Sequence, residues 1–241
     1  PAAPFITATL QQEASRKLSF TGQRTMKVAQ QLYEGVNVDG LGITGLITYM
    51  RTDSVNLSDL ALNTAKAEII EMAGDKYYKR RQYSTKSKGA QEAHEAIRPT
   101  YLNVREIEGT AQERKLYDLI WKRTIASQMA DAEFEKTTAI INIDNSDEKF
   151  VAVGEVLKFD GFLNVYMEST DDDSTQETEG MLPKLAEGDI LSMSQMQAQE
   201  RFTQRPARYT EASLVRKLEE LGIGRPSTYA PTISTILARE Y

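Results

Sequence analysis

The hydrophobic pattern of this chain changes twice, and the two changes limit its fold more than any other feature. Apolar residues recur at helical spacing up to about Phe134 and again after Pro206. Between these points lie runs of β-branched and aromatic residues, often alternating with polar ones, which is typical of strands. We therefore predict an α+β, multidomain protein, with a helical domain at 1–133, a β-rich segment at 134–205 and a further helical segment at 206–241.

Capping signals place the ends of the expected helices. Four are expected in the first half: from a capping box at 9–12 to about Leu18, from Met26 to Glu34 with Gly35 as its stop, from an N-cap at Ser58 to Gly74, and from a capping box at 110–113 to about Met129. The glycines after the second helix, Gly40, Gly42 and Gly45, predict a loop.

The rest of the chain carries its own turn signals. Strands are expected at 137–143, 150–159 and 162–167, followed by an acidic, mobile loop at 169–180. A helix is then predicted at 211–221, and Ser227 is expected to cap another. Two helices joined by a short Gly-containing turn also suggest a helix-turn-helix.

The charge of the chain is unevenly distributed. The net charge is −6, but six carboxylates fall in residues 168–180, which hold no lysine or arginine, so the remainder is neutral. A neutral remainder can present local positive patches to phosphates. The run Asp171-Asp172-Asp173 is not interpreted as a metal site, because it lies in a low-complexity stretch with no flanking strand to fix the ligands.

Residues 47–54, ITYMRTDS, carry the strongest chemical signal. They set the phenol of Tyr49 beside the guanidinium of Arg51, flanked by hydroxyls and a carboxylate. A tyrosine oxygen is a poor nucleophile at neutral pH, and an adjacent arginine both favours the phenolate and neutralises a phosphate oxygen. This pairing is what a tyrosine needs to attack a phosphodiester through a covalent phosphotyrosine, although most tyrosines are packing residues and the arginine alone changes that expectation little. A plain surface ion pair between Arg51 and Asp53 is the alternative.

A second segment, EAHEAIRPT at 92–100, holds the only histidine, His94. Periodicity predicts a short helix that ends at Pro99 and carries Arg98 on the same face as His94. Such a pair can bind one phosphate, although a lone histidine is more often structural than catalytic.

A third segment, GIGRPSTY at 222–229, combines features that suit an anion. Its glycines allow close backbone approach, Arg225 adds charge, and Ser227 and Thr228 are expected to open a helix whose free N–H groups favour a phosphate. An ordinary turn with an N-cap explains the serine and the glycines but not their combination with arginine.

These three segments, in this order, resemble the motifs of bacterial type IA DNA topoisomerases, and so do residues 116–121 and 206–215 between them. The resemblance runs from about Pro4 to Tyr241. It implies that Tyr49 attacks a single-strand phosphodiester to give a 5′-phosphotyrosyl link and a free 3′-hydroxyl. It further implies that Arg51 clamps the phosphate and that His94 positions DNA or handles a proton. The implied contacts to the DNA backbone are Thr52, Ser54, Arg98, Arg225, Ser227 and Thr228.

The resemblance also implies that the chain is an internal piece of a longer protein. In the family, a preceding Toprim domain carries the acidic residues that bind Mg²⁺, so we expect no metal on this chain and no relaxation of negatively supercoiled DNA by it alone. Single-stranded DNA is the expected partner. An incomplete β-rich segment leaves open strand edges, which favours a homodimer through strand exchange.

Other observations bound the function. The sequence lacks a membrane-length apolar run, a signal peptide and cysteine, which fits a cytoplasmic protein. The basic and aromatic run at 76–83 has the composition of a single-strand platform, but a solvated loop is preferred. Two other functions compete with that of a topoisomerase. One is a non-enzymatic helix-turn-helix DNA-binding module, and the other, less favoured, is a tyrosine recombinase, which leaves a 3′ rather than a 5′ phosphotyrosyl link.

Overall fold

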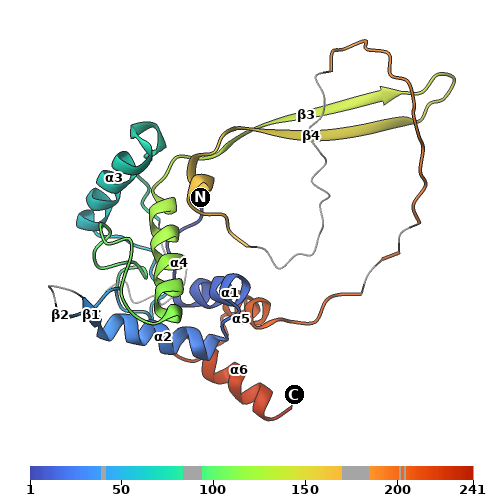
Figure 1. Ribbon diagram of the computed structural model, residues 1–241. Coiled ribbons are helices and arrows are strands. Elements are labelled where there is room, and N and C mark those ends of the chain that lie inside the picture. The colour runs from blue at the N-terminus through green and yellow to red at the C-terminus, as the bar shows by residue number, and fades with distance from the viewer. Residues whose placement is uncertain (39–41, 84–93, 170–184, 201, 204, 241) are drawn as a thin grey trace. The chain divides into compact units, whose positions relative to one another are not determined.

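The computed structural model describes residues 1–38, 42–83, 94–169, 185–200, 202–203 and 205–240. It divides into two compact units (Figure 1). The helical unit comprises Pro1–Asp131, Asp160–Asp171 and Tyr209–Tyr241, and the β unit comprises Ala132–Phe159 and Asp172–Arg208. The acidic stretch expected as a loop lies outside the described residues, apart from its first residue, Ser169.

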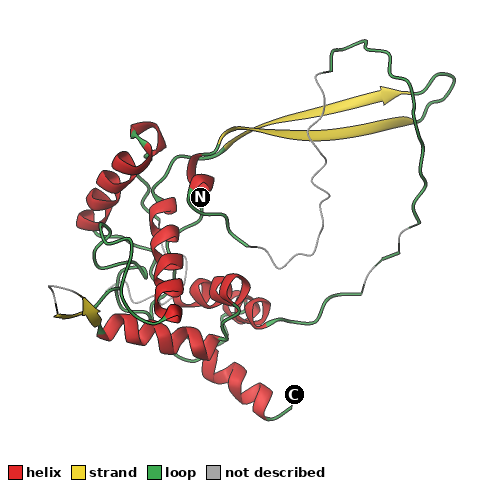
Figure 2. Cartoon of the chain, in the orientation of Figure 1, coloured by secondary structure: helices red, strands yellow, loops and turns green. Residues whose placement is uncertain are grey.

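Figure 2 shows that helices dominate the described chain. In sequence order the elements are α1 (Thr7–Leu18), α2 (Gly22–Glu34), β1 (Val36–Val38), β2 (Gly42–Thr44), α3 (Asp59–Ala73), the 3₁₀ turn η1 (Asp75–Tyr77), α4 (Ala111–Ser127), β3 (Glu133–Asn142), β4 (Lys149–Phe159), the 3₁₀ turn η2 (Gly161–Asn164), α5 (Glu211–Glu220) and α6 (Tyr229–Ala238).

Helix α4 forms the centre of the helical unit and packs against α1, α2 and α3 (Figure 1). Its apolar residues, including Leu116, Ile120 and Ile125, are fully buried against Phe5 and Leu32 from the N-terminal segment and α2. This burial of large side chains supplies most of the favourable free energy of folding. The unit therefore offers a rigid scaffold on which loops can hold functional groups.

Two helices have the boundaries that their capping residues predict. The Ser58 hydroxyl accepts from the backbone N–H of Ala61 at the start of α3, and Gly74 ends that helix with φ 94°. At α4 the hydroxyl of Thr110 accepts from the N–H of Glu113, whose carboxylate accepts from the N–H of Thr110. This reciprocal pair is the predicted capping box.

Helices α1 and α2 begin earlier than predicted. Thr9 is not the N-cap of α1, because its hydroxyl reaches back to accept from the N–H of Ile6, and the helix begins at Thr7. Helix α2 begins at Gly22 rather than Met26. Its first N–H donates to the carboxylate of Glu211 at 2.8 Å, a partner far along the chain that local sequence does not reveal.

The expected glycine loop after α2 is in part a hairpin. Strands β1 and β2 pair antiparallel, with Val36 opposite Thr44, while Gly40 lies outside the described residues. Glycines at turns and bulges can permit either a loop or a hairpin, so the sequence prediction was wrong for this segment.

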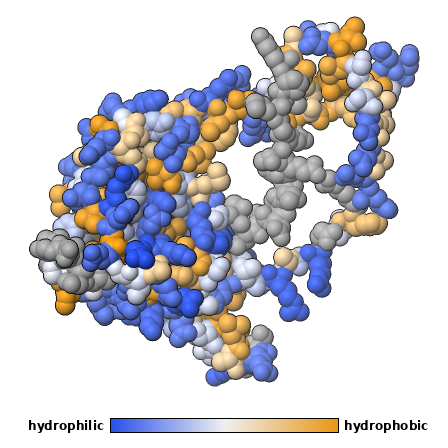
Figure 3. Space-filling model, viewed as in Figure 1, coloured by the Kyte–Doolittle hydropathy of each residue, from blue (hydrophilic) through white to orange (hydrophobic). Residues whose placement is uncertain are grey.

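The β unit, taken by itself, contains the antiparallel pair β3 and β4. These strands confirm the predictions for 137–143 and 150–159, with Thr138 opposite Val153. Both faces are largely exposed, and Phe134, Ile140 and Val151 each expose at least half of their area. Figure 3 shows apolar residues on the surface of this unit.

The third strand, expected at 162–167, is absent. Residues 161–164 form η2, and the N–H of Phe162 donates to the carbonyl of Ala130. Gly161 has φ 46°, and a Cβ there would lie 2.4 Å from the carbonyl oxygen of Asp131. The close approach of this glycine to the end of the α4 segment, not the β propensity of the following residues, sets the local backbone.

At the C-terminal end, α5 and α6 confirm the two predicted helices, with Pro231 in the first turn of α6. Ser227 is not the cap, because α6 begins two residues later. A small apolar cluster joins these helices to α1 through Ala8, Val215 and Ile233. Among the described residues, no helix is long and apolar enough to span a membrane.

Candidate active site

The loop that carries Tyr49 is anchored by the first residue of α1. The hydroxyl of Thr7 donates to the carbonyl of Met50 at 2.7 Å and accepts from the N–H of Thr52 at 2.9 Å. The N–H of Thr7 in turn donates to the carbonyl of Thr52. These bonds are buried, so they fix the backbone on the C-terminal side of Tyr49.

The N-terminal side of the same loop pairs with the second motif. The N–H of Thr48 donates to the carbonyl of Arg98, the N–H of Arg98 donates to the hydroxyl of Thr48, and both distances are 2.9 Å. An antiparallel bridge joins Ile47 to Pro99. Two motifs that are almost fifty residues apart in sequence therefore form one local structure.

This pairing corrects the predicted helix around His94. The described residues 94–100 are extended rather than helical, and Ile97 bonds through its N–H to the carbonyl of Phe5. Pro99 disfavours helical geometry at Arg98, and long-range backbone bonds supply the partners that a helix would have given. His94 and Arg98 consequently do not share a helix face.

His94 nevertheless lies beside Tyr49. The two ring centroids are 5.3 Å apart with planes inclined at 44°. The ring of Tyr33, at the end of α2, meets the Tyr49 ring edge-on, with centroids 5.4 Å apart and planes at 68°. The Tyr49 ring is half-buried against the core, so two aromatic neighbours and the core restrict its orientation.

Arg98 holds a carboxylate. Its Nε donates to Glu95 at 2.9 Å, and the same carboxylate accepts from the backbone N–H of Ser58 at the start of α3. Burial acts to raise the pKa of the Glu95 carboxyl, but the bond from Ser58 and the charge of Arg98 outweigh burial and hold that pKa below its ordinary value. Arg98 and Glu95 thus tie the second motif to α3, and the predicted contact of Arg98 to DNA stays a prediction.

Thr52 and Ser54 are also structural in this arrangement. They expose 2% and 0% of their area, and each hydroxyl accepts a backbone N–H, from Ser54 and Asn56 respectively. Hydroxyls that are buried and bonded in this way shape the loop. Both hydroxyls are thus engaged within the loop, and their predicted contacts to DNA stay predictions.

Arg51 has the opposite environment. It is exposed, and it makes no ion pair with Asp53 or with any other described residue. It lines a hollow of about 230 Å³ together with Pro226 and Ser227 of the third motif. Helices α2 and α6 complete the lining with Gln23, Met26, Ala230, Pro231 and Ser234. The guanidinium of Arg51 therefore borders a hollow of mixed polar and apolar lining, where it can bind an anion.

The third motif forms a tight turn at the edge of this hollow. The N–H of Arg225 donates to the hydroxyl of Thr228 at 2.8 Å, and Gly224 adopts φ 88°. Arg225, Ser227 and Thr228 are all exposed, and the Thr228 hydroxyl also holds the turn. Of the three predicted DNA contacts in this motif, Ser227 is the one that shares a hollow with Arg51.

Tyr229 was quoted in the motif but given no role by the sequence. It is buried against Ala8 and Ile233. Burial raises its pKa, and the nearby carboxylates of Glu219 and Asp53 raise it further. Tyr229 is thus a packing residue that joins the start of α6 to α1 and α5.

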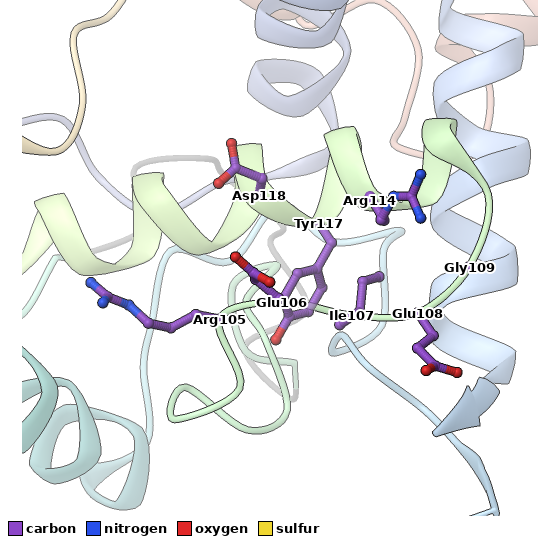
Figure 4. A pocket seen from close by; sticks show the side chains of 8 residues that line it. All are labelled: Arg105, Glu106, Ile107, Glu108, Gly109, Arg114, Tyr117 and Asp118. Atoms are coloured by element: carbon purple, nitrogen blue, oxygen red, sulfur yellow. The ribbon is translucent and has the colours of Figure 1, made fainter. Parts of the chain in front are cut away.

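Other candidate features of the described chain lie apart from this site. Lys79 and Arg81, in the basic run, both pair with Asp131, while residues 79–83 are irregular and several of their side chains are exposed, as the preferred solvated loop predicts. No cluster of three potential metal ligands occurs among the described residues. A hollow of about 590 Å³ beside α4 is lined by Glu106, Tyr117 and other residues of 105–118, none of them in the three motifs (Figure 4).

The site thus places the partly exposed phenol of Tyr49 beside the imidazole of His94, on a loop whose arginine borders a hollow. The family model for DNA topoisomerases of the bacterial type matches residues 1–241. The chain therefore belongs to the type IA DNA topoisomerase family.

A solved structure supports the same assignment. The full-length topoisomerase I of Thermotoga maritima, in a monoclinic crystal form, is 37% identical to this chain with a TM-score of 0.78. The match covers 100% of this chain and 38% of that one, so the chain spans well under half of that structure. The predicted family and the α+β fold class are confirmed.

Proposed function

We propose that this chain supplies the strand-cleaving tyrosine of a type IA DNA topoisomerase, with Tyr49 as the nucleophile. The observation that carries the proposal is the position of the Tyr49 ring. It is partly exposed, lies beside His94, and stands two residues from Arg51, which borders a hollow and has no ion-pair partner among the described residues. Tyr229 and Tyr117 are by contrast buried in packing positions.

The proposed chemistry is a transesterification. The oxygen of Tyr49 attacks the phosphorus of a single-strand phosphodiester, the bond from phosphorus to the 3′-oxygen breaks, and that oxygen takes a proton to become a free hydroxyl. The new 5′-phosphotyrosyl bond conserves the energy of the old one. Attack by the 3′-hydroxyl then restores the strand without ATP, and relaxation of negative supercoils follows when another strand passes between the two steps.

Arg51 and His94 have distinct proposed roles. The planar guanidinium of Arg51 binds the scissile phosphate and stabilises the extra negative charge of the pentacovalent transition state. The imidazole of His94, in contact with the Tyr49 ring, positions the DNA or handles the proton of the reacting hydroxyls.

The proposed partner is single-stranded DNA. Arg225 and Ser227 are exposed at the turn beside the Arg51 hollow, so they are the side chains of the third motif best placed to contact the backbone of the strand. Binding through such contacts releases counterions and weakens as salt rises. Strand exchange through the open edges of β3 and β4 is the proposed route to a homodimer.

We propose that the chain works as part of a longer protein in the cytoplasm and does not relax DNA alone. It spans 38% of the topoisomerase structure that it matches. We assign any Mg²⁺ in the reaction to the acidic residues of the Toprim domain that the family resemblance implies.

The test is to trap the covalent adduct with end-labelled single-stranded DNA. The longer protein that contains this chain is incubated with DNA, denatured and digested, and the label shows which end of the cleaved strand is attached. A 5′ link that is lost in Tyr49→Phe supports the proposal. A 3′ link would match a recombinase, and DNA binding without any link would match the helix-turn-helix module.

A further inference from the structure

The orientation of the Tyr49 ring depends on a residue that the proposed chemistry does not use. Tyr33 lies in the last turn of α2, and its ring contacts the Tyr49 ring edge-on. The His94 ring contacts the same Tyr49 ring in a tilted arrangement. The phenol that must reach a phosphate is thus bordered by two rings from separate elements.

The meeting of Tyr33 and Tyr49 is built into the backbone. The N–H of Leu46 donates to the carbonyl of Leu32 at 2.8 Å, which joins the end of α2 to the start of the Tyr49 loop. Gly45 lies against the carbonyl of Tyr33, where a Cβ would come within 2.8 Å of that oxygen. Any side chain at Gly45 would therefore push the loop away from α2.

A second glycine closes the same junction. Gly35 ends α2 with φ 113°, and a Cβ there would lie 2.9 Å from Ile43 and from the backbone of Thr44. The β1–β2 hairpin can consequently leave α2 and return to it within a few residues. Since both glycines are placed where no side chain fits, the junction between α2 and the Tyr49 loop is closely determined.

We propose that Tyr33 is a positioning residue for strand cleavage, with its ring fixing the direction in which the Tyr49 hydroxyl points. This inference rests on the proposed function of Tyr49. An edge-on aromatic contact restricts rotation of the partner ring, and a nucleophile must be held close to its line of attack for rapid reaction.

The exposure of Tyr33 separates this role from simple packing. Its side chain is 40% exposed, whereas the core residues of α2, Val28 and Leu32, expose 3% and 0%. Removing a ring that is so exposed leaves most of the core intact. The effect on chemistry can therefore be measured in a folded protein.

The experiment compares variants of the longer protein that contains this chain. Single-turnover cleavage of a labelled oligonucleotide gives the rate of cleavage. A titration with the same oligonucleotide, under conditions in which no cleavage occurs, gives the affinity for DNA. We expect Tyr33→Ala and Tyr33→Leu to slow cleavage about tenfold or more with the DNA affinity unchanged, because misorientation of a reacting group acts on the rate. We expect Tyr33→Phe, which keeps the ring, to restore the wild-type rate.

Two further variants complete the design. Tyr101, which is 47% exposed and outside the site, gives the matched control Tyr101→Ala, expected to cleave normally. Gly45→Ala displaces the loop without touching either ring and is expected to slow cleavage as Tyr33→Ala does. Wild-type rates in both Tyr33→Ala and Tyr33→Leu would overturn the inference, and so would a Tyr33→Phe variant as slow as Tyr33→Ala.

The result also distinguishes this inference from the function on which it rests. An adduct that persists in Tyr49→Phe contradicts the proposed nucleophile. An adduct that vanishes in Tyr49→Phe, together with unchanged cleavage in Tyr33→Ala, contradicts the positioning role alone.

Discussion

The two faces of the Tyr49 loop differ sharply. On the inner face Thr48, Thr52 and Ser54 use their hydroxyls in hydrogen bonds to the backbone of the loop itself or of the second motif. On the outer face Tyr49 is half-exposed and Arg51 has no charged partner among the residues described. The inner face fixes the backbone, and the outer face keeps its reactive groups available.

The two arginines of the motifs make the same contrast. Arg98 is half-buried and bonded to Glu95, so it must give up a carboxylate before it can bind a phosphate. Arg51 has no such carboxylate partner in the part of the chain that the structure describes. An anion site therefore forms more readily at Arg51, and sequence alone, which shows only an arginine near each reactive residue, does not distinguish the two.

The largest effect is expected on the outer face. Arg51→Ala should lower the rate of cleavage about 100-fold or more, because it removes charge stabilisation from the transition state. The melting temperature should stay unchanged, since the side chain of Arg51 is exposed and makes no ion pair with a described residue. Single-turnover cleavage and thermal melting measure the two quantities. Cleavage close to the wild-type rate would exclude Arg51 from the mechanism.

A stability effect is expected on the inner face. Thr7→Val removes the hydroxyl that accepts from the N–H of Thr52 and donates to the carbonyl of Met50, and leaves both groups buried without that partner. The expected loss is about 1–3 kcal/mol in the free energy of unfolding. Urea denaturation measures it, with Thr64→Val on the exposed face of α3 as the control. Equal stabilities of the two variants would refute the anchoring role.

A smaller effect is expected at the third motif. Arg225→Ala should weaken binding of single-stranded DNA and reduce the slope of log affinity against log salt by about one, because one phosphate contact is lost. Ser227→Ala should weaken binding with no change in that slope. Fluorescence anisotropy at several salt concentrations gives both values. An unaltered slope in Arg225→Ala would place this arginine away from the DNA.

The smallest effect concerns pH. The pKa of Glu95 is lowered in the folded state, so the unfolded chain binds the proton more tightly and stability falls as pH drops below the ordinary value of 4.5. Above that pH the contribution is fully present. The stability difference between wild type and Glu95→Gln should therefore shrink as the solution is acidified through this range. Denaturation series at several pH values test this, and a constant difference would contradict it.

The sequence correctly predicted helix ends that are set by hydrogen bonds between residues close together in the chain. Ser58, Gly74 and the reciprocal pair of Thr110 and Glu113 set helix ends through partners within four residues. Such contacts are visible in a short stretch of sequence.

The predictions from sequence were wrong where partners that are distant in the sequence determine the local backbone structure. The segment after His94 is extended because Phe5 and Thr48 bond to its backbone, and the residues after Gly161 leave the sheet because that glycine packs on Asp131. For the site, the sequence identified Tyr49, Arg51 and Ser227 as candidate residues. It could not show that Thr52 and Ser54 point inward, or that Tyr33 contacts the Tyr49 ring.

The most direct test of the account is to map the DNA-linked residue. The adduct is formed with the longer protein, the DNA is trimmed to a short remnant, and the peptides are sequenced by mass spectrometry, which distinguishes all 11 tyrosines of the chain. The account predicts the nucleotide remnant on the peptide that contains Tyr49 and on no other. A remnant on Tyr33, Tyr229 or any other tyrosine would contradict it.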